Sequence, residues 1–464
     1  MHRRTLLLSA FFALATSHLH AQSMPSMDMP PKPQTAKPAP PNAPSMNMTM
    51  PMPQPTTLID NELQHTTSGT SIEPASTPTP MLMTEHGSWT LMLHGIAFVS
   101  DIQQHAANDR GADKLFSTNW IMPMAQHPLG AHGLLTLRTM LSLEPATITG
   151  RYYPELFQQG ETAYGRAIVD GQHPHNLFME IAALYDLHLG THSLLSLYLA
   201  PIGDPAIGPT AYPHRLSASE DPLAALGHHQ QDSTHIAFNV LTAGFTYRTL
   251  RLEASGFHGA EPTESRWQPE PSPNGHAVDS YSSRLTWTPT PNLAAQYSIA
   301  QITSPEALEP TTNQRRQTAS VMLNHPFGAH QSMPGMTMPG DHPTTSNWAT
   351  TLLWGQTRSS TNGNLENSYL LESLLQFRTR NYLWTRIESA ARTSELLDLP
   401  GPETTIGHVQ AYTLGYDRDY RIAPHLLAAP GAQFTLYRTP DSLASTYGRD
   451  PFSAVAFVRL RLAH

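Results

Sequence analysis

The sequence predicts an all-β fold, a transmembrane antiparallel β-barrel of about 16 strands, within a range of about 12 to 18, preceded by a disordered tail. Three observations predict this fold. The body of the chain alternates apolar and polar residues with a period of two. Tight and long connections alternate along it. The chain opens with an export signal, yet no later run of about 18 apolar residues is present that would form a membrane helix.

Composition limits the classes of function. The 464 residues carry 27 Lys+Arg against 36 Asp+Glu, and the resulting net charge of −9 argues against a general nucleic-acid-binding protein. Only 14% of the residues are charged, against roughly 25% in an ordinary soluble domain. Cysteine is absent, which excludes disulfides, cysteine-ligated zinc and cysteine nucleophiles. A metal site would have to use the 25 His, the 19 Met or carboxylates.

Three segments follow one another along the chain. Residues 1–21 have a basic start, an apolar run and a small final residue, as in a secretory signal peptide. Residues 22–85 are rich in Met, Pro and Thr and poor in aromatic residues, so we predict a disordered periplasmic tail. Residues 86–464 are the predicted barrel, placed in the outer membrane of a Gram-negative-type bacterium with lipid as its surroundings.

Alternation identifies the strands of the body. Leu135, Leu137 and Leu141 share one face, while Thr136 and Arg138 take the other. Similar segments predict strands at 89–102, 115–126, 133–144, 175–188, 192–201, 235–247, 250–259, 279–289, 292–303, 316–325, 347–357, 366–378, 381–393, 408–419, 425–438 and 452–463. A secreted soluble β-sandwich or propeller also alternates and is the competing interpretation.

Connection lengths favour the barrel. Segments 127–131 and 189–191 are tight, whereas 145–174 and 202–234 are long. Outer-membrane barrels have short periplasmic turns and long outer loops. On this strand count both termini face the periplasm.

Methionines are clustered on that same side. Two clusters in the tail comprise Met24, Met27, Met29, Met46, Met48, Met50 and Met52. A third, Met333, Met336 and Met338 followed by His342, lies between the tenth and eleventh predicted strands. A thioether is a soft, uncharged ligand that suits Cu(I), and it binds without losing a proton. The clusters therefore predict copper capture. The alternative is a Pro-rich spacer in which Met is incidental.

Histidines are concentrated in two long outer loops. The candidate metal ligands there are His173, His175, His228, His229, Asp232 and His235. Imidazole and carboxylate ligands suit Cu(II), Zn or Ni. The alternative is that these side chains hydrogen-bond the loops to each other and to the lumen wall, which would form a plug or constriction.

The sequence offers little for catalysis. It contains no GxSxG motif, no GxGxxG opening a helix, no P-loop and no HExxH. We therefore expect a protein that is not an enzyme and holds no organic cofactor. A metalloenzyme centred on the histidines is a minor alternative.

Two motifs carry a resemblance. The run GETAYG at 160–165 followed by DGQHPH at 170–175, and then GHHQQDSTH at 227–235, resembles a group of exported bacterial proteins that look like outer-membrane barrels. The resemblance covers most of residues 87–464. In overall plan, a Met-rich exported tail ahead of a barrel, the chain is also similar to the copper-resistance protein B family. That similarity implies a role in copper handling.

The leading hypothesis is an outer-membrane barrel that binds copper and serves copper tolerance or handling, with copper ions and periplasmic copper-handling proteins as partners. A general or substrate-selective porin with a His-rich constriction and no metal role is the alternative. A structural or adhesion barrel is the third.

Overall fold

The computed structural model describes residues 54–163, 166–232, 237–259, 266–268, 278–306, 309–328, 346–394, 397–399 and 406–463. Within these ranges, no helix has the length and apolar character needed to cross a membrane.

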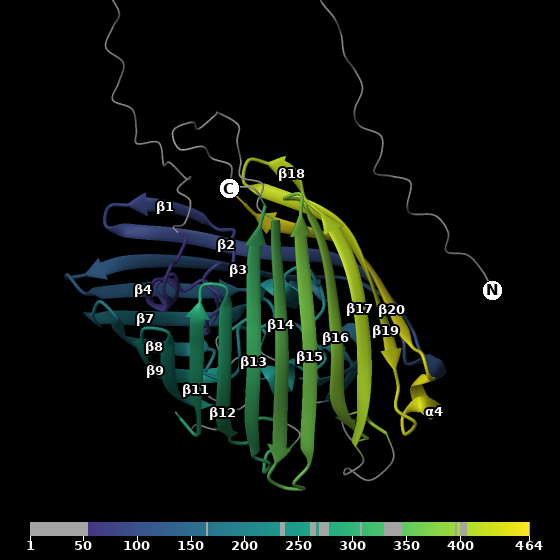
Figure 1. The fold of residues 1–464 in the computed structure, drawn as a ribbon. Helices are drawn as coiled ribbons and strands as arrows, with labels where there is room; N and C mark the ends of the chain where they lie inside the picture. The colour runs from purple at the N-terminus through teal and green to yellow at the C-terminus, as the bar shows by residue number, and fades with distance from the viewer. Residues whose placement is uncertain are drawn as a thin grey trace, which may run out of the picture. The chain divides into compact units, whose positions relative to one another are not determined.

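Sixteen long strands of the described residues form one closed antiparallel ring (Figure 1). Each strand pairs with the next along the chain, and the last pairs with the first, with Val99 opposite Val458. The strands are β2 (Trp89–His105), β3 (Lys114–Leu129), β4 (Gly133–Leu141), β7 (Phe178–Gly190), β8 (Ser193–Gly203), β9 (Ala237–Tyr247), β10 (Leu250–His258), β11 (Ser280–Thr290), β12 (Leu293–Ile302), β13 (Gln314–Phe327), β14 (Ser346–Ser359), β15 (Leu365–Phe377), β16 (Asn381–Thr393), β17 (Ile406–Arg418), β19 (Leu426–Arg438) and β20 (Phe452–Leu462).

The remaining elements are short. β1 (Leu82–His86) pairs with the first half of β2, and β18 (Tyr420–Ala423) pairs with the start of β19. β5 (Tyr153–Ala163) and β6 (Arg166–Gln172) form a separate two-stranded sheet. The helices are α1 (Leu58–Glu62), η1 (Ala107–Asp109), α2 (Glu144–Thr147), η2 (Leu216–Ala218), α3 (His228–Gln231) and α4 (Ala444–Tyr447).

The outer face of the ring is apolar and its inner face carries many polar side chains, which is the reverse of the arrangement in a soluble protein. On β9, Leu241 and Phe245 point outward and are about half exposed, whereas Thr242 and Thr246 point inward and are buried. Lipid cannot hydrogen-bond an open sheet edge, so a spanning sheet must close on itself with its apolar side outward. The closed ring confirms the predicted transmembrane barrel and overturns the soluble sandwich or propeller.

The connections differ between the two ends of the barrel. At one end, β7 and β8 are joined through Thr191 and His192, and β9 and β10 through Arg248 and Thr249. We call this the short-turn end. At the other end, the chain makes longer excursions, including residues 142–177 and 204–232. We call it the long-loop end.

All sixteen predicted strand ranges overlap the strands of the ring. The agreement follows from the closed geometry, because every strand must present one face to lipid and one to the lumen, and so keeps the period of two. The prediction missed β1, β5, β6 and β18, which are not part of that repeating pattern.

The predicted disorder of residues 22–85 was wrong for residues 54–85, while residues 22–53 lie outside the described residues. Residues 54–81 are ordered inside the barrel and lead into β1. Helix α1 begins with a capping box, in which the side chains of Thr57 and Asp60 each accept a hydrogen bond from the other's backbone N–H. The segment has no core of its own. Its backbone is paired by the barrel wall, which composition does not reveal.

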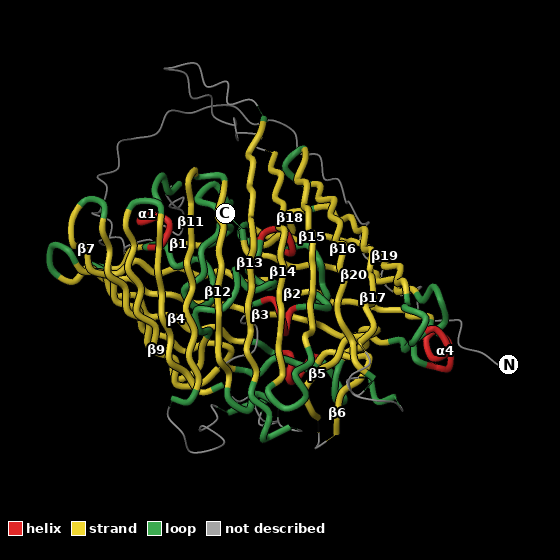
Figure 2. The backbone as a smooth tube through the Cα atoms, turned by 60° about the horizontal axis from the view of Figure 1, so that its bottom comes forward, coloured by secondary structure: helices red, strands yellow, loops and turns green. Residues whose placement is uncertain are grey.

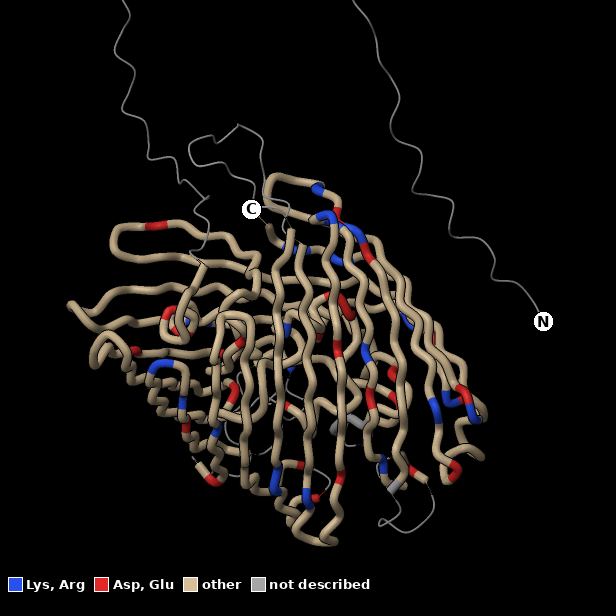
Figure 3. The backbone as a smooth tube through the Cα atoms, viewed as in Figure 1, with Lys and Arg blue, Asp and Glu red and all other residues tan. Residues whose placement is uncertain are grey.

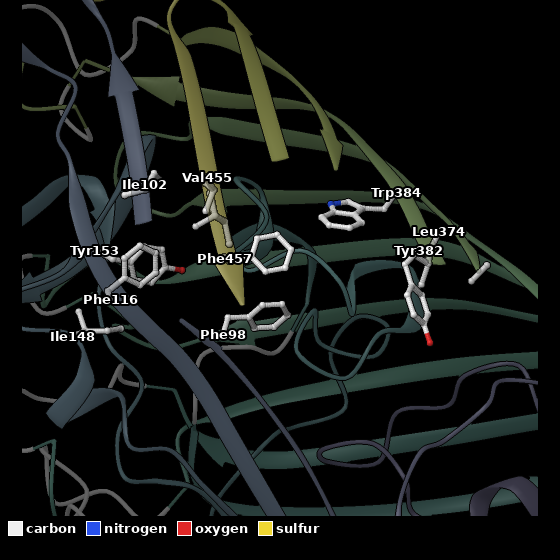
Figure 4. Packing of buried hydrophobic residues seen from close by; sticks show 12 residues of the cluster. Phe98, Ile102, Phe116, Ile148, Tyr153, Leu374, Tyr382, Trp384, Val455 and Phe457 are labelled. Atoms are coloured by element: carbon white, nitrogen blue, oxygen red, sulfur yellow. The ribbon is translucent and has the colours of Figure 1, made fainter. Parts of the chain in front are cut away.

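Aromatic side chains fill part of the lumen. Phe116 of the wall stacks on Tyr153 of β5, with ring centroids 4.7 Å apart (Figure 4). Phe98 meets Phe457 edge to face at 5.6 Å across the seam between β2 and β20. Leu223, from segment 204–232, belongs to the same cluster. The wall and the inserted loops therefore share one hydrophobic core inside the barrel.

The lipid-facing assignment predicts a depth-dependent cost of charge. Leu352 lies outward in the middle of β14, so Leu352→Arg should lower the free energy of unfolding in bilayers by about 2–4 kcal/mol. Leu365 lies outward at the start of β15, and Leu365→Arg should cost at most about 1 kcal/mol. Denaturant titration of the protein in lipid vesicles measures both. Equal costs at the two positions would contradict the assignment.

Candidate functional site

The candidate site is the interior of the barrel, which the chain itself occupies. Three segments enter it, namely residues 54–81, residues 142–177 without the undescribed 164 and 165, and residues 204–232, and we call them together the plug. Loops and short helices of these segments lie within the wall of strands in Figure 2. Charged residues are marked both on the strands and on the chain between them in Figure 3.

Arg138 on β4 holds the first segment. Its guanidinium donates to the backbone oxygens of His65, Thr67 and Gly69 at 2.6–3.0 Å. It also makes a bidentate pair with Glu180 on β7, at 2.6 and 2.7 Å. These contacts use all five N–H donors of an arginine. The fully buried guanidinium is therefore satisfied only while residues 65–69 are in place.

Gly69 fits this clamp because of its backbone. Its φ is +57°, in the left-handed region that favours glycine. Its N–H donates to Glu180 at 2.9 Å while its carbonyl accepts from Arg138. A Cβ at this position would lie 2.7 Å from the Cβ of Asp204, which belongs to another plug segment. The close approach joins two plug segments at the wall.

A second arginine pair stands on β10 and β11. Arg251 pairs with Glu62 of α1 at 2.7 Å. Arg284 pairs with Glu253 through two hydrogen bonds, and it also donates to the hydroxyl of Thr70. The same guanidinium donates at 3.1 Å to the carbonyl of Gly208, in segment 204–232. The two arginines thus bind two plug segments at once.

On β16, Arg386 and Arg392 bind the two other segments. Arg386 donates to the carbonyls of Leu223 and Ala224, both at 3.1 Å. Arg392 donates to the carbonyls of Phe157 and Leu226, at 2.5 and 2.6 Å.

Two further ion pairs join the plug to the wall. Arg215 of the plug pairs with Glu372 on β15 at 2.8 Å. Arg459 on β20 pairs with Glu220 of the plug at 2.6 Å. Wall arginines and acids therefore hold the plug around much of the circumference.

The predicted histidines all lie in the plug, where described. The Nδ1 of His175 lies 2.9 Å from a carboxylate oxygen of Glu144, and the Nδ1 of His228 lies 2.9 Å from the amide nitrogen of Gln158. Tyr212 stands between the two motifs, with ring centroids 6.4 Å from His175 and 5.5 Å from His228. His173 and His229 are the ring neighbours of these histidines, at 6.3 and 4.2 Å. The fold thus brings the two sequence motifs into one region.

Among the predicted ligands that the structure describes, the histidines and Asp232 are not grouped as a metal centre. In the described part of the chain, no three His, Asp or Glu side chains converge so that they could hold a metal ion. Asp232 instead lies 3.5 Å from Arg215. His235 lies outside the described residues, as do the methionine clusters at 24–52 and 333–338 and His342.

Sequence reasoning missed the wall residues that face the plug. It also missed buried methionines and histidines on β2, β3 and β4, among them Met92, His94, Met122 and Met124. A signal for the latter was present. Met92 and His94, and likewise Met122 and Met124, are two residues apart in strands and so share the inward face.

Two buried carboxylic acids in the plug have raised pKa values. Burial raises the pKa of Glu73 to about 7, although the backbone N–H of Leu216 donates to its carboxylate at 3.0 Å. Burial, together with the nearby charge of Glu180, raises the pKa of Asp204 to about 7. Burial lowers the pKa of His214 well below its ordinary value. The seated plug therefore favours neutral acids and a neutral imidazole.

The fold is similar to that of solved porins. An anion-selective porin from Comamonas acidovorans aligns with 80% of this chain and 99% of its own, at 11% identity and a TM-score of 0.46. OmpT, an outer membrane protein of Vibrio cholerae, aligns with 81% and 98%, at 8% identity and a TM-score of 0.42. A mutant of the Rh. blastica porin aligns with 80% and 99%, at 11% identity and a TM-score of 0.36.

No family model and no curated protein sequence matches the chain. At these identities the similarity to porins concerns the fold. The assignment as a closed barrel rests on the strand pairing itself, in which β2 pairs with both β3 and β20.

The raised pKa values of Glu73 and Asp204 predict a pH dependence of plug seating. Glu73 and Asp204 bind protons more tightly when buried than when released, so raising the pH through about 7 should weaken seating. Conductance of single barrels in planar bilayers should therefore increase from about pH 5 to about pH 8. Asp204→Asn should flatten this profile, and Asp441→Asn, at an exposed long-loop position, should leave it unchanged. A conductance that falls with rising pH would contradict this link between the burial of the two acids and the seating of the plug.

Proposed function

We propose that this protein is a gated outer-membrane channel of porin type, whose lumen is closed by its own plug and which catalyses no reaction. The observation that supports it best is the clamp at Arg138, where a wall arginine donates to three backbone carbonyls of one plug segment. A structural or adhesion barrel would not need the lumen to be held in this way.

Burial of the inner wall supports closure. Thr136, Ser298 and Ser368 face inward on three different strands and are 0% exposed. In a water-filled channel these small polar side chains would be hydrated. Instead, the hydroxyl of Ser298 contacts the plug, where it accepts a hydrogen bond from the backbone N–H of Gly208 at 2.8 Å.

The nature of the contacts supports a gate rather than a permanent seal. Buried ion pairs are expensive to desolvate, and well-packed apolar residues of similar volume often stabilise a fold at least as well. A plug bound through guanidinium groups and backbone carbonyls makes contacts that water can replace on release. The chain therefore uses interactions suited to reversible seating.

The path of the first segment supports withdrawal towards the short-turn end. Thr57 and Ile59 line a cavity of about 310 Å³ together with Thr191, Thr249 and Thr290 of the short turns. At its other end, the segment runs into β1, which pairs with the start of β2 at the same end of the barrel. Both ends of residues 54–81 thus lie at one mouth, and the segment can leave without threading through the barrel.

The clamp provides the test of this function. The double variant Arg138→Gln, Glu180→Gln removes both partners of the buried pair, so neither charge is left unpaired. We expect wild-type barrels in planar bilayers to be mostly closed, and the double variant to be open for at least about tenfold more of the time, as loss of about 1.4 kcal/mol of seating would give.

Arg380→Gln is the matched control, because Arg380 is exposed in the turn between β15 and β16. It should keep the wild-type conductance. A large, constant wild-type conductance, or a double variant that stays as closed as wild type, would refute the gated channel.

Copper handling is the second candidate. It is supported by the Met-rich residues 24–52, which precede the plug directly in the sequence, and by the thioether preference of Cu(I). On this proposal the tail captures Cu(I) in the periplasm, with periplasmic copper-handling proteins as partners, and the plug couples the tail to the barrel. Replacing the tail methionines with leucine should then reduce the number of Cu(I) ions that the mature protein binds. A general porin without a metal role would lose none.

A further inference from the structure

A cluster of sulfur and imidazole groups lies inside the barrel, apart from the arginine clamps. We call it the methionine–histidine cluster. Its members are Met81, Met92, Met122, Met124, Met140, Met179, His94 and His214. Met83 packs against it. All six methionines are buried, with exposed fractions of 0–8%.

The methionines are not spread around the barrel. Eight methionines occur among the described residues, and seven of them belong to this cluster or pack against it. The eighth is Met322, on β13. Methionine used only as a general gap filler would be expected on many of the sixteen inner faces. Here seven of the eight described methionines lie on β1 to β4, on β7 and at the residue before β1.

Strand register arranges these side chains in two rows. Met83 lies opposite Met92, and Met92 lies opposite Met124, so one row crosses β1, β2 and β3. In the next row, His94 lies opposite Met122. Side chains directly opposite on one face of an antiparallel pair have Cβ atoms about 4.5–5.5 Å apart. The rows therefore bring thioethers and an imidazole within reach of a common point.

A second imidazole, that of His214, lies beside the row that contains His94. His214, from the plug, places its Nε2 3.2 Å from the Sδ of Met140 on β4. The rings of His94 and His214 are 5.7 Å apart, and Trp120 lies against both, at 5.1 and 4.2 Å. Both histidines line a cavity of about 90 Å³, which is large enough for several water-sized groups.

A buried nitrogen of His94 indicates that a ligand binds in this cluster. Its side chain is 5% exposed, and its Nε2 has no hydrogen-bond partner within the part of the chain that the structure describes. Buried polar atoms are normally paired, because an unpaired one costs about 1–3 kcal/mol. An unsatisfied nitrogen beside several thioethers is chemically suited to a soft cation.

We propose that the methionine–histidine cluster binds one Cu(I) ion through the thioethers of Met122 and Met140 and the Nε2 of His94. Thioether and imidazole ligands together favour Cu(I) over Zn or Mg, which prefer harder or more numerous nitrogen and oxygen ligands. No proton leaves a methionine on binding, and no redox step is involved. Met92 and Met124 form the row nearer the short-turn end and provide an approach to the ion.

The proposal goes beyond both proposed functions. It concerns different residues from the tail methionines, and it does not require the plug to open. Met140 and His94 belong to the wall, whereas Met81 and His214 belong to the chain inside it. The three proposed ligands stand on β2, β3 and β4, so a bound ion would tie three wall strands together beside the plug residues Met81 and His214. By linkage, Cu(I) should stabilise the closed barrel against unfolding.

The experiment uses the full mature chain with its other methionine clusters silenced. Met24, Met27, Met29, Met46, Met48, Met50, Met52, Met333, Met336 and Met338 are changed to leucine. Cu(I) affinity of this parent is measured by competition with a coloured Cu(I) chelator. We expect it to bind one Cu(I), and we expect the double variant Met122→Leu, Met140→Leu in the same background to bind at least about tenfold more weakly.

Met322→Leu is the matched control, since it removes a buried inward methionine on the opposite part of the wall. It should bind like the parent. Exchange of Met for Leu nearly conserves volume, and heat-induced unfolding of each variant without copper checks the fold. His94→Phe, which retains a ring of similar shape, gives a second variant and should also weaken binding.

X-ray absorption at the copper edge identifies the ligands. We expect sulfur together with nitrogen in the parent and loss of nitrogen in His94→Phe. A silenced parent that binds no Cu(I), a double variant that binds like the parent, or equal weakening by Met322→Leu would each overturn the site. None of these results bears on the conductance of the channel, and the loss of ions between wild type and silenced parent measures the tail separately.

Discussion

The arrangement of the plug depends on the buried arginines of the wall, because each guanidinium group requires several hydrogen-bond acceptors. A guanidinium carries five N–H donors and keeps its charge at any physiological pH. Arg138, Arg251 and Arg392 project from the wall and are at most 1% exposed. Buried there, Arg138 binds Glu180 and the carbonyl oxygens of His65, Thr67 and Gly69. Arg251 pairs with Glu62 and Glu253. Arg392 donates to the carbonyls of Phe157 and Leu226. The plug is held to the wall through these polar contacts and also through shared hydrophobic clusters, in one of which Phe157 and Leu226 pack with Val409 of the wall.

This dependence explains the division of the sequence into parts of different character. The strands need alternation because one face meets lipid and the other meets the plug. The plug segments need backbone groups that turn towards the wall, as Gly69 does with its positive φ. The low proportion of charged residues fits the same arrangement, because charges are concentrated where a partner is present in the lumen. Long loops are then structural parts of the interior.

Much of the fold could be predicted from the sequence, because the repeating constraint is local. Residues such as Leu135 and Leu137 alternate with Thr136 and Arg138 whatever the rest of the chain does. The plug could not be predicted in the same way. Residues 54–81 contain no periodic pattern, and their order depends on partners more than a hundred positions away, as in the pair of His65 with Asp186. Composition therefore indicated disorder where tertiary contacts impose a fixed path.

The candidate sites were predicted unevenly for a related reason. His175 and His228 stood out because they occur in dense motifs, and the fold does bring them together around Tyr212. The row of His94 and Met122 stood out less, because its members come from two strands and only register reveals that they are opposite. Spacing of two within a strand marks a shared face, but pairing between strands decides which faces meet.

The central claim is that residues 54–81 close the lumen, and thiol accessibility tests it most directly. The chain has no cysteine, so Ser71→Cys introduces one thiol into the plug, at a position that is 8% exposed. Ser88→Cys introduces one in the exposed turn before β2. With a water-soluble thiol reagent, the structure predicts that the thiol at 71 reacts far more slowly than the thiol at 88, and that Arg138→Gln, Glu180→Gln removes most of the difference. Equal rates at both positions in the otherwise wild-type barrel would contradict a closed lumen.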